Sequence, residues 1–341
     1  MSLSPSCSIT LGDLRYDSHA LELSVTLSVL PGVNSFRVDL PATVTVSCQP
    51  GDPARLDVDG GEGVVTVLVG TVRAVNRSFR SVRVTAADAG ADLASLRSAV
   101  TATGQAGADV VARLADEAAV TVGENALDLP LSAYTTHQGR TASEHVAYLA
   151  GLGGAYAVVD ADNTLALRVR PSGPADLALL YGRELIECDV RDFPIRAAAL
   201  PIGNGPAGSA DAPDALRPTP GPLPDGSPAP GRDARWIAAP VLRTPATAQK
   251  AAESYARARA GTGRRLHARG FLMPALRPGM AIEIQELPGA FGDGAWLLTR
   301  VVHRLRPYDA GTTIIDGESL AAPSGLPGLG AAALAAVGSL L

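Results

Sequence analysis

The first 90 residues of the chain alternate between apolar and polar positions. From Leu21 to Val29, in LELSVTLSV, every second residue is apolar and those between are polar or charged. A period of two buries one face of a β-strand and leaves the other facing solvent. The same alternation is present in SFRVDLP (35–41), TVTVSC (43–48), VVTVLVG (64–70) and RSVRVTAAD (80–88), with turn residues between the segments. Short alternating strands at this spacing predict an antiparallel barrel or sandwich.

The period changes after Asp88. In GADVVARLADEAAV (107–120) the apolar residues recur at helical spacing. Thr141 and Glu144 form a capping box, in which each side chain bonds a free backbone N–H at the start of a helix. AYAVVD and TLALRVR, separated by a short polar turn, predict a hairpin after that helix. Residues 90–180 are therefore expected to form a small α+β domain.

The last part of the chain returns to strand-like text, interrupted by a helix and a loop. Strands are predicted in Tyr181 to Gly203 and in the segments MAIEIQEL, WLLTRVVHRLRP and GTTIIDGES. In WLLTRVVHRLRP apolar residues adjoin, which predicts that part of this strand is buried on both sides. Thr244-Pro245 predicts the start of a helix over 245–260, ended by Gly261. Between Gly203 and Asp233, 14 of 31 residues are Pro or Gly, which predicts a flexible inserted loop. The apolar tail, 321–341, is expected either to dock on a neighbouring chain or to be disordered.

The composition of the chain reduces the number of functional classes that fit it. The 341 residues carry a net charge of −5, without the basic footprint that nucleic-acid binding usually needs. Aromatic residues are only 4%, so the cores are expected to be built from Val, Leu, Ile and Ala. Cys7, Cys48 and Cys188 lie too far apart for a zinc or dithiol motif, which favours a reduced, cytoplasmic setting. Neither a secretory signal nor an apolar run of about 18 residues is present, so no transmembrane segment is predicted.

Candidate chemistry was weighed against structural explanations. His303 has Glu283, Glu286 and Asp293 nearby in sequence, a combination that acid–base catalysis can use, but no nucleophile motif accompanies it. We expect a solvated or interface histidine there. His137 and His145 lack the HExxH spacing of a zinc site. The sequence therefore predicts no catalytic, cofactor-binding or metal-ligating residue, and no enzyme.

Three other segments suggest chemistry and are explained more simply. GLGGAY (151–156) has its helix and strand in the wrong order for a dinucleotide loop. DVDGGEG (57–63) fails the spacing of an EF-hand and predicts a hairpin turn. A basic run is expected to form a salt-bridged face or a protein interface; its members are Arg257, Arg259, Arg264, Arg265 and Arg269.

The ordered set of motifs resembles a known family. The features of its C-terminal strands are Pro278-Gly279 before a strand, Trp296 at the start of the next strand, Val301-Val302-His303 within it, and Thr312-Thr313 in the last strand. These strands resemble those of tail-hub proteins, the late-control D-like hubs of contractile phages and injection systems. The predicted α+β segment and YGREL (181–185) resemble the middle of that family. The order of parts matches over roughly residues 5–320.

The resemblance implies a β-rich α+β fold with two tube-type antiparallel β-barrels flanking a small α+β domain. The barrels would comprise 1–89 and, together, 181–202 and 234–320, leaving 203–233 as the loop and 321–341 as the tail. It also implies a homotrimer that joins a hexameric inner tube to a separate spike protein, beside other baseplate proteins, in a cytoplasmically assembled particle. The alternatives are a β-rich carbohydrate- or surface-binding module, which would show an exposed aromatic platform, and a hydrolase that uses His303 or His137 as its base.

Overall fold

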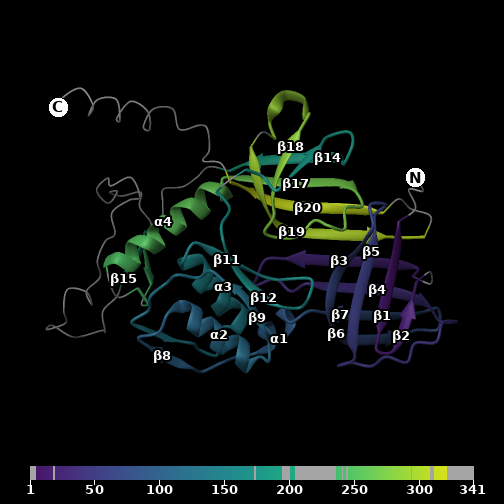
Figure 1. Cartoon of the computed structure of the whole chain (residues 1–341), viewed down its shortest axis with the longest axis horizontal. Coiled ribbons are helices and arrows are strands. Elements are labelled where there is room, and N and C mark those ends of the chain that lie inside the picture. The colour runs from purple at the N-terminus through teal and green to yellow at the C-terminus, as the bar shows by residue number, and fades with distance from the viewer. Residues whose placement is uncertain are drawn as a thin grey trace.

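A single large sheet dominates the structure, with a small α+β unit packed beside it (Figure 1). The computed structural model describes residues 5–320 except 18–19, 173, 194–199, 204–235, 240, 243–244, 293 and 308–310. The predicted loop, apart from Gly203, and the predicted tail therefore lie outside the described residues. Thirteen strands belong to the sheet, whose main path is β14-β17-β20-β19-β3-β4-β7-β6-β5-β1-β2.

The first part of the chain supplies one half of this sheet, and all its pairings are antiparallel. Burial alternates along these strands as the period of two predicts; in β3, for example, Leu23, Val25 and Leu27 are buried. The strands are β1 (Ser6–Leu11), β2 (Leu14–Tyr16), β3 (Glu22–Ser28), β4 (Ser35–Pro41), β5 (Pro53–Asp59), β6 (Val64–Arg77) and β7 (Ser81–Ala87).

One predicted strand in this half is wrong. TVTVSC (43–48) is not a strand, although Cys48 is buried against the core. Its carbonyl groups are bonded by side chains: Tyr16 Oη donates to Thr45 O at 3.0 Å, and Arg77 Nη2 donates to Val46 O at 3.1 Å. Alternating burial therefore survives in this segment without a strand partner, because side-chain donors replace the ladder.

The α+β unit follows the predicted pattern with additions. The capping box at the start of α3 is present, with Thr141 N donating to Glu144 Oε2 at 2.7 Å and Glu144 N donating to Thr141 Oγ1 at 3.3 Å. The predicted hairpin is β11 with β12, and β9 joins β12 in parallel, a pairing that the sequence did not reveal. The elements are α1 (Gly90–Ser95), β8 (Thr101–Thr103), α2 (Gly107–Glu117), β9 (Val122–Asn125), β10 (Ala133–Thr135), α3 (Ala142–Leu152), β11 (Ala155–Val159) and β12 (Leu165–Val169).

The last part of the chain completes the sheet. Helix α4 continues one residue beyond Gly261, and β15 pairs with β16 outside the large sheet. The elements are β13 (Leu177–Leu180), β14 (Leu185–Asp192), β15 (Leu200–Gly203), β16 (Trp236–Ala239), α4 (Pro245–Thr262), β17 (Arg264–Phe271), β18 (Ala281–Gln285), a 3₁₀ turn η2 (Pro288–Ala290), β19 (Ala295–Leu305) and β20 (Thr312–Ser319).

Strand β19 joins the two halves of the sheet. On one edge it pairs with β20 along most of its length. On the other edge its first residues pair with β18, and residues from Arg300 to Leu305 pair with β3. Both faces of β19 are largely buried, as the adjoining apolar residues predicted. The chain thus brings residues about 270 positions apart into one ladder.

The hydrophobic core also extends across both halves of the sheet. Buried residues from both sheet halves form one cluster, from Ile9 and Val84 to Trp296 and Ile315. A second cluster fills the α+β unit and includes Leu30 from the first half and Ala251 from α4. The fold is β-rich α+β with mostly antiparallel pairing, as expected. Among the described residues the strand path does not close, so the two expected barrels are not found as closed barrels.

Candidate functional site

His303, the main catalytic candidate, lies in the core. Its side chain is fully buried, which corrects the expectation of a solvated or interface histidine. His303 lies on the same side of β19 as the buried Val301 and Leu305, opposite the exposed Arg300 and Arg304, so the strand alternation itself places it in the core. Nδ1 lies 3.0 Å from Thr313 Oγ1, and Nε2 has no hydrogen-bond partner in the described part of the chain. Burial, with a smaller effect of Arg277, lowers the pKa of His303 to about 3.

The carboxylates near His303 in sequence do not join it. Glu283 and Glu286 are exposed on and after β18, and Asp293 lies outside the described residues. A neutral, buried imidazole bonded to a hydroxyl cannot exchange protons with a substrate in solvent. The structure therefore removes the proposed acid–base pair at His303.

The other two candidate histidines, His137 and His145, form a cluster at the start of α3. Their rings meet edge to face with centroids 5.2 Å apart, although the sequence spacing gave no reason to pair them. Tyr134 Oη lies 2.6 Å from Nδ1 of the buried His145, and His137 N donates to Nε2 of His145 at 3.3 Å. Burial lowers the pKa of His145 and raises that of Tyr134. A neutral imidazole held by a phenol and a backbone amide fixes the segment before α3 rather than activating a nucleophile.

Two motifs that suggested ligand binding are structural. In the β5–β6 turn, Asp59 Oδ1 accepts from Gly61 N at 2.7 Å and from Gly63 N at 3.1 Å, which confirms the predicted hairpin turn. GLGGAY ends α3 and enters β11, in the order expected. No group of three or more His, Cys, Asp or Glu side chains in the described ranges is placed to hold a metal ion.

Two arginines of the basic run, Arg264 and Arg269, form ion pairs. Arg264 Nε lies 3.1 Å from Asp192 Oδ1, and Arg269 Nη1 lies 3.6 Å from Glu187 Oε1. These are the cross-strand pairs of a salt-bridged face, one of the two alternatives predicted. Arg265, between them on β17, has no such carboxylate partner among the described residues.

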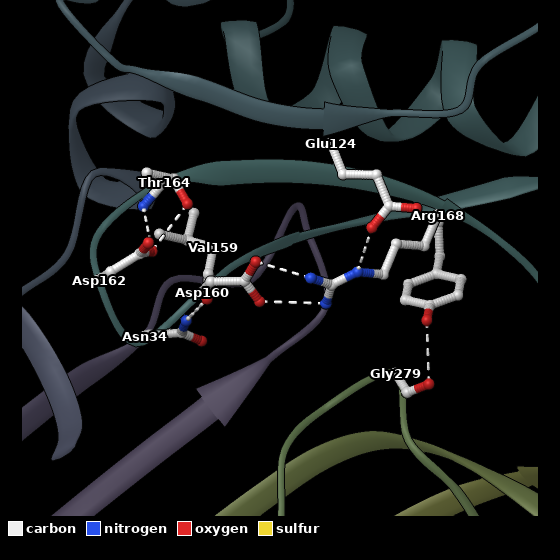
Figure 2. A network of polar contacts seen from close by, with 9 residues as sticks. Asn34, Glu124, Val159, Asp160, Asp162, Thr164, Arg168 and Gly279 are labelled. Atoms are coloured by element: carbon white, nitrogen blue, oxygen red, sulfur yellow. Dashed lines mark hydrogen bonds and ion pairs between the residues drawn. The ribbon is translucent and has the colours of Figure 1, made fainter. Parts of the chain in front are cut away.

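A polar junction connects the sheet to the α+β unit (Figure 2). Asn34, in the β3–β4 connection, accepts from Ser28 N through Oδ1 at 2.7 Å and donates through Nδ2 to Val159 O at 3.0 Å. Its buried side chain therefore links segments 125 residues apart. Arg168 holds Asp160 with two bonds, of 3.1 and 2.8 Å, and Glu124 with a third of 3.0 Å. The Asn34 bond to Val159 thus connects the α+β unit to the large sheet, while the Arg168 bonds hold β9, β11 and β12 together.

Arg277 is the partly buried cation of the junction. Its guanidinium donates to the carbonyl oxygens of Thr66 and Pro274, each at 2.7 Å, and to that of Leu276 at 3.1 Å. Burial lowers the pKa of Arg277 to about 10, which leaves it charged at neutral pH. Before Thr71, the edge of β6 that would face β7 has no strand partner in the described ladders, so Arg277 occupies an otherwise open edge.

Asp88 is the buried acid of the junction. Oδ1 accepts from Gly90 N at 2.9 Å, while the buried Oδ2 has no partner within the described part of the chain. Burial raises the pKa of Asp88 to about 7, against the opposing effects of Gly90 and Asn34. Asp88, Asn34 and Arg277 line a cavity of about 10 Å³, close to the smallest volume that holds one water molecule.

Sequence reasoning missed this junction. Its members are single polar residues at ends of elements, with no shared motif, and they meet only when distant segments pack. Two weak signals existed: Asp88 marks the change of hydrophobic period, and Arg277 directly precedes the Pro-Gly turn. Such positions are expected to connect one packed unit to the next.

An exposed apolar groove lies elsewhere on the sheet. It has a volume of about 710 Å³ and is lined by the β5–β6 turn, β13 and the segment after β17. Val64, Leu177 and Phe271 expose 71%, 41% and 49% of their surface there, an amount typical of interaction sites. Within the described ranges, no helix is both long and apolar enough to cross a membrane.

Comparisons with known proteins identify the fold. No family model matches the chain, and no curated protein matches it by sequence. Among solved structures, a tail protein from Neisseria meningitidis is similar with a TM-score of 0.68 and 14% identity, over 93% of this chain and 97% of that one. A 43 kDa tail protein of prophage MuSo2 from Shewanella oneidensis gives 0.63 and 15%, over 92% and 98%. An Escherichia coli type VI secretion component described as similar to T4 tail proteins gives 0.59 and 10%, over 92% and 77%.

Proposed function

We propose, from the fold that this chain shares with phage and prophage tail proteins, that it is a structural hub of the baseplate of a contractile injection system or phage tail. The resemblance expected from the sequence agrees with these comparisons at the level of fold. The observation that carries the proposal is the similarity to the Neisseria tail protein over nearly the whole of both chains. A shared α+β unit alone would not produce such coverage.

The proposed role is a trimeric adaptor with pseudo-sixfold symmetry between a hexameric inner tube and a separate spike. In this proposal the two strand sets of each chain, which meet where β3 pairs with β19, would act as the two equivalent parts that a trimer needs to match a hexamer. The domain division predicted from the sequence, with tube-type barrels on either side of the α+β unit, belongs to this proposal. A similar structure comes from a PdpA-VgrG complex of Francisella, which supports assembly of this chain with a partner protein, here proposed to be the spike.

The alternatives find less support. The exposed phenylalanines of the described chain lie on separate elements: Phe79 on the β6–β7 turn, Phe193 after β14, Phe271 at the end of β17 and Phe291 after η2. They do not form the flat aromatic platform expected of a carbohydrate-binding module. For the hydrolase alternative, the burial of His303 in the core removes one candidate base, and the exposed His137 remains.

The test is recovery of the tagged full chain from native cells that express the particle genes, with mass spectrometry and negative-stain imaging. Tube, sheath, spike and baseplate proteins with tubular particles are expected. In vitro, light scattering with the purified spike should give a mass of three copies of 34.8 kDa plus the spike. Recovery of the chain alone would contradict the proposal.

A control variant separates the enzyme reading. His137→Ala changes an exposed side chain and should leave particle assembly unchanged. His303→Ala is unsuitable as the discriminating variant, because it would open a cavity in the core. Loss of a hydrolytic turnover in His137→Ala, with assembly intact, would favour the hydrolase.

A further inference from the structure

The outward face of strands β14, β17, β20 and β19 carries charges in rows across the sheet. In one row, Asp189, His267, Asp316 and Arg300 lie opposite one another in the ladder. Around Asp316 the row is matched: His267 Nδ1 lies 2.7 Å from Asp316 Oδ1, and Arg300 Nη1 lies 3.2 Å from Asp316 Oδ2.

The neighbouring row is not matched. Arg191 on β14 lies directly opposite Arg265 on β17, which lies opposite Glu318 on β20. Glu318 is bonded instead by Arg170, whose Nη2 lies 3.1 Å from Glu318 Oε2. Among the described residues no carboxylate lies within ion-pair distance of Arg191 or Arg265. Like charges directly opposite on a sheet destabilise it, so this pair carries a cost that the chain itself does not offset.

The unmatched pair faces an open groove. A depression of about 460 Å³ is lined by Arg191, Arg265, His267, Arg300 and Phe193, together with Asp316 and Glu318. The guanidinium of Arg265 lies 5.8 Å from the centre of the Phe193 ring, which holds it over the groove. A planar anion between the two guanidinium groups would accept charge-assisted bonds from both.

We infer that this groove is a docking site for a carboxylate-bearing segment of a partner protein, with the carboxylate bridging Arg191 and Arg265. The inference goes beyond the proposed function and rests only on the geometry of this sheet face. Phosphate-rich ligands are disfavoured, because Asp316 and Glu318 line the groove and repel a polyanion, and because the chain carries a net charge of −5. A protein segment with isolated carboxylates among polar residues fits the mixed charge of the groove.

The experiment uses the full chain and an acetylated, amidated Ser-Gly-Glu-Gly-Ser peptide, with its Gln counterpart as a neutral probe. Binding is followed through the arginine Nε–H signals by NMR, at low salt. The Glu peptide should shift the signals of Arg191 and Arg265, and the Gln peptide should not. Arg191→Gln and Arg265→Gln should each weaken binding about tenfold or more, since each removes charge-assisted bonds.

The matched control is Arg269→Gln, which makes the same change four positions along β17 in a residue already paired with Glu187. It should bind the Glu peptide like the wild type. Because Arg265→Gln also relieves repulsion, it should unfold at the same or a higher temperature than the wild type, so that lost binding cannot be attributed to unfolding.

Three results would overturn the inference. The first is no shift with the Glu peptide. The second is an equal loss of binding in Arg269→Gln, which would indicate a general electrostatic effect. The third is tighter binding of a thymidine oligonucleotide than of the peptide, lost in the same two variants, which would assign the groove to nucleic acid. The failure of this inference would leave the proposed hub role unaffected, because particle recovery tests that role separately.

Discussion

The phenol of Tyr156 is packed against the backbone of Gly279. Tyr156 Oη donates to Gly279 O at 3.0 Å, and a Cβ at Gly279 would lie 2.4 Å from the Tyr156 ring. Gly279 also has a φ of 91°, a conformation that side chains rarely adopt. The Pro-Gly turn is thus where the last third of the sheet rests on the α+β unit, and only glycine fits there.

Gly279→Ala is therefore expected to destabilise the fold by about 2–5 kcal/mol, because it combines a strained φ with a steric clash. Urea unfolding measures the effect. The matched control is Gly289→Ala, where φ is 78° and nothing lies within 4 Å of the added Cβ. The control should cost only about 1 kcal/mol. Equal effects of both variants would mean that the contact with Tyr156 is unimportant.

Asn34→Ala should cost about 1–3 kcal/mol, because Ser28 N–H and Val159 C=O both lose their partner at a buried site. Thermal or urea unfolding gives the value. Asn76→Ala, an exposed change on β6, serves as the control and should stay within about 0.5 kcal/mol of the wild type. If Asn34→Ala is equally neutral, the junction does not contribute to stability.

Asp88 should make the protein less stable as pH rises. Its folded-state pKa of about 7 lies above the ordinary 3.8, so the folded chain keeps a proton that the unfolded chain releases. The resulting stability is present below about pH 4 and is lost as pH rises through 7. Asp88→Asn cannot ionise, so it should gain about 2–4 kcal/mol on the wild type between pH 4 and 8. Urea unfolding across this range measures the gain, and Asp13→Asn, an exposed change, should show none.

His303 should act in the opposite direction. Its folded-state pKa of about 3 lies below the ordinary 6.5, so only the unfolded chain takes up the proton. Stability from the neutral imidazole is present above pH 6.5 and is lost as pH falls toward 3. His303→Asn removes the titration, so the free-energy gap between wild type and variant should narrow on acidification. A gap that stays constant with pH would contradict a buried neutral His303.

Arg277→Met is expected to cost about 3–5 kcal/mol. The variant keeps much of the side-chain length but leaves the carbonyls of Thr66, Pro274 and Leu276 without this donor. Arg306→Met is the control, since Arg306 is exposed and pairs only with Glu22 at the surface. Similar unfolding curves for the two variants would show that the open edge of β6 does not need Arg277.

The sequence predicts strands and helices well where one face is buried along a whole element. Burial in β3, β4 and β20 repeats every second residue, and Thr141 and Glu144 mark the start of α3 by their own side chains. These signals are local. TVTVSC shows their limit, because the same alternation arises where side chains, rather than a strand, satisfy the backbone.

The sequence does not indicate which strand pairs with each strand edge. Nothing in β3 or β19 indicates that they pair with each other, since register depends on packing between distant segments. The burial of His303 and the position of Arg277 both follow from that pairing. For the same reason the polar junction was not predicted, whereas the ordered motifs were sufficient to suggest the tail-protein fold.

Because β3 pairs with β19, one edge of β3 stays unpaired during most of the synthesis of the chain. On the ribosome, β3 and its neighbour β4 emerge early, but the strand that covers the other edge of β3 ends only at Leu305. Until then a nascent chain presents an open row of backbone donors and acceptors, which adjacent nascent chains on a polysome are able to capture. Premature termination before β19 would therefore yield aggregating fragments, and rapid translation of the last strands, or a chaperone bound at β3, would protect the yield of folded protein.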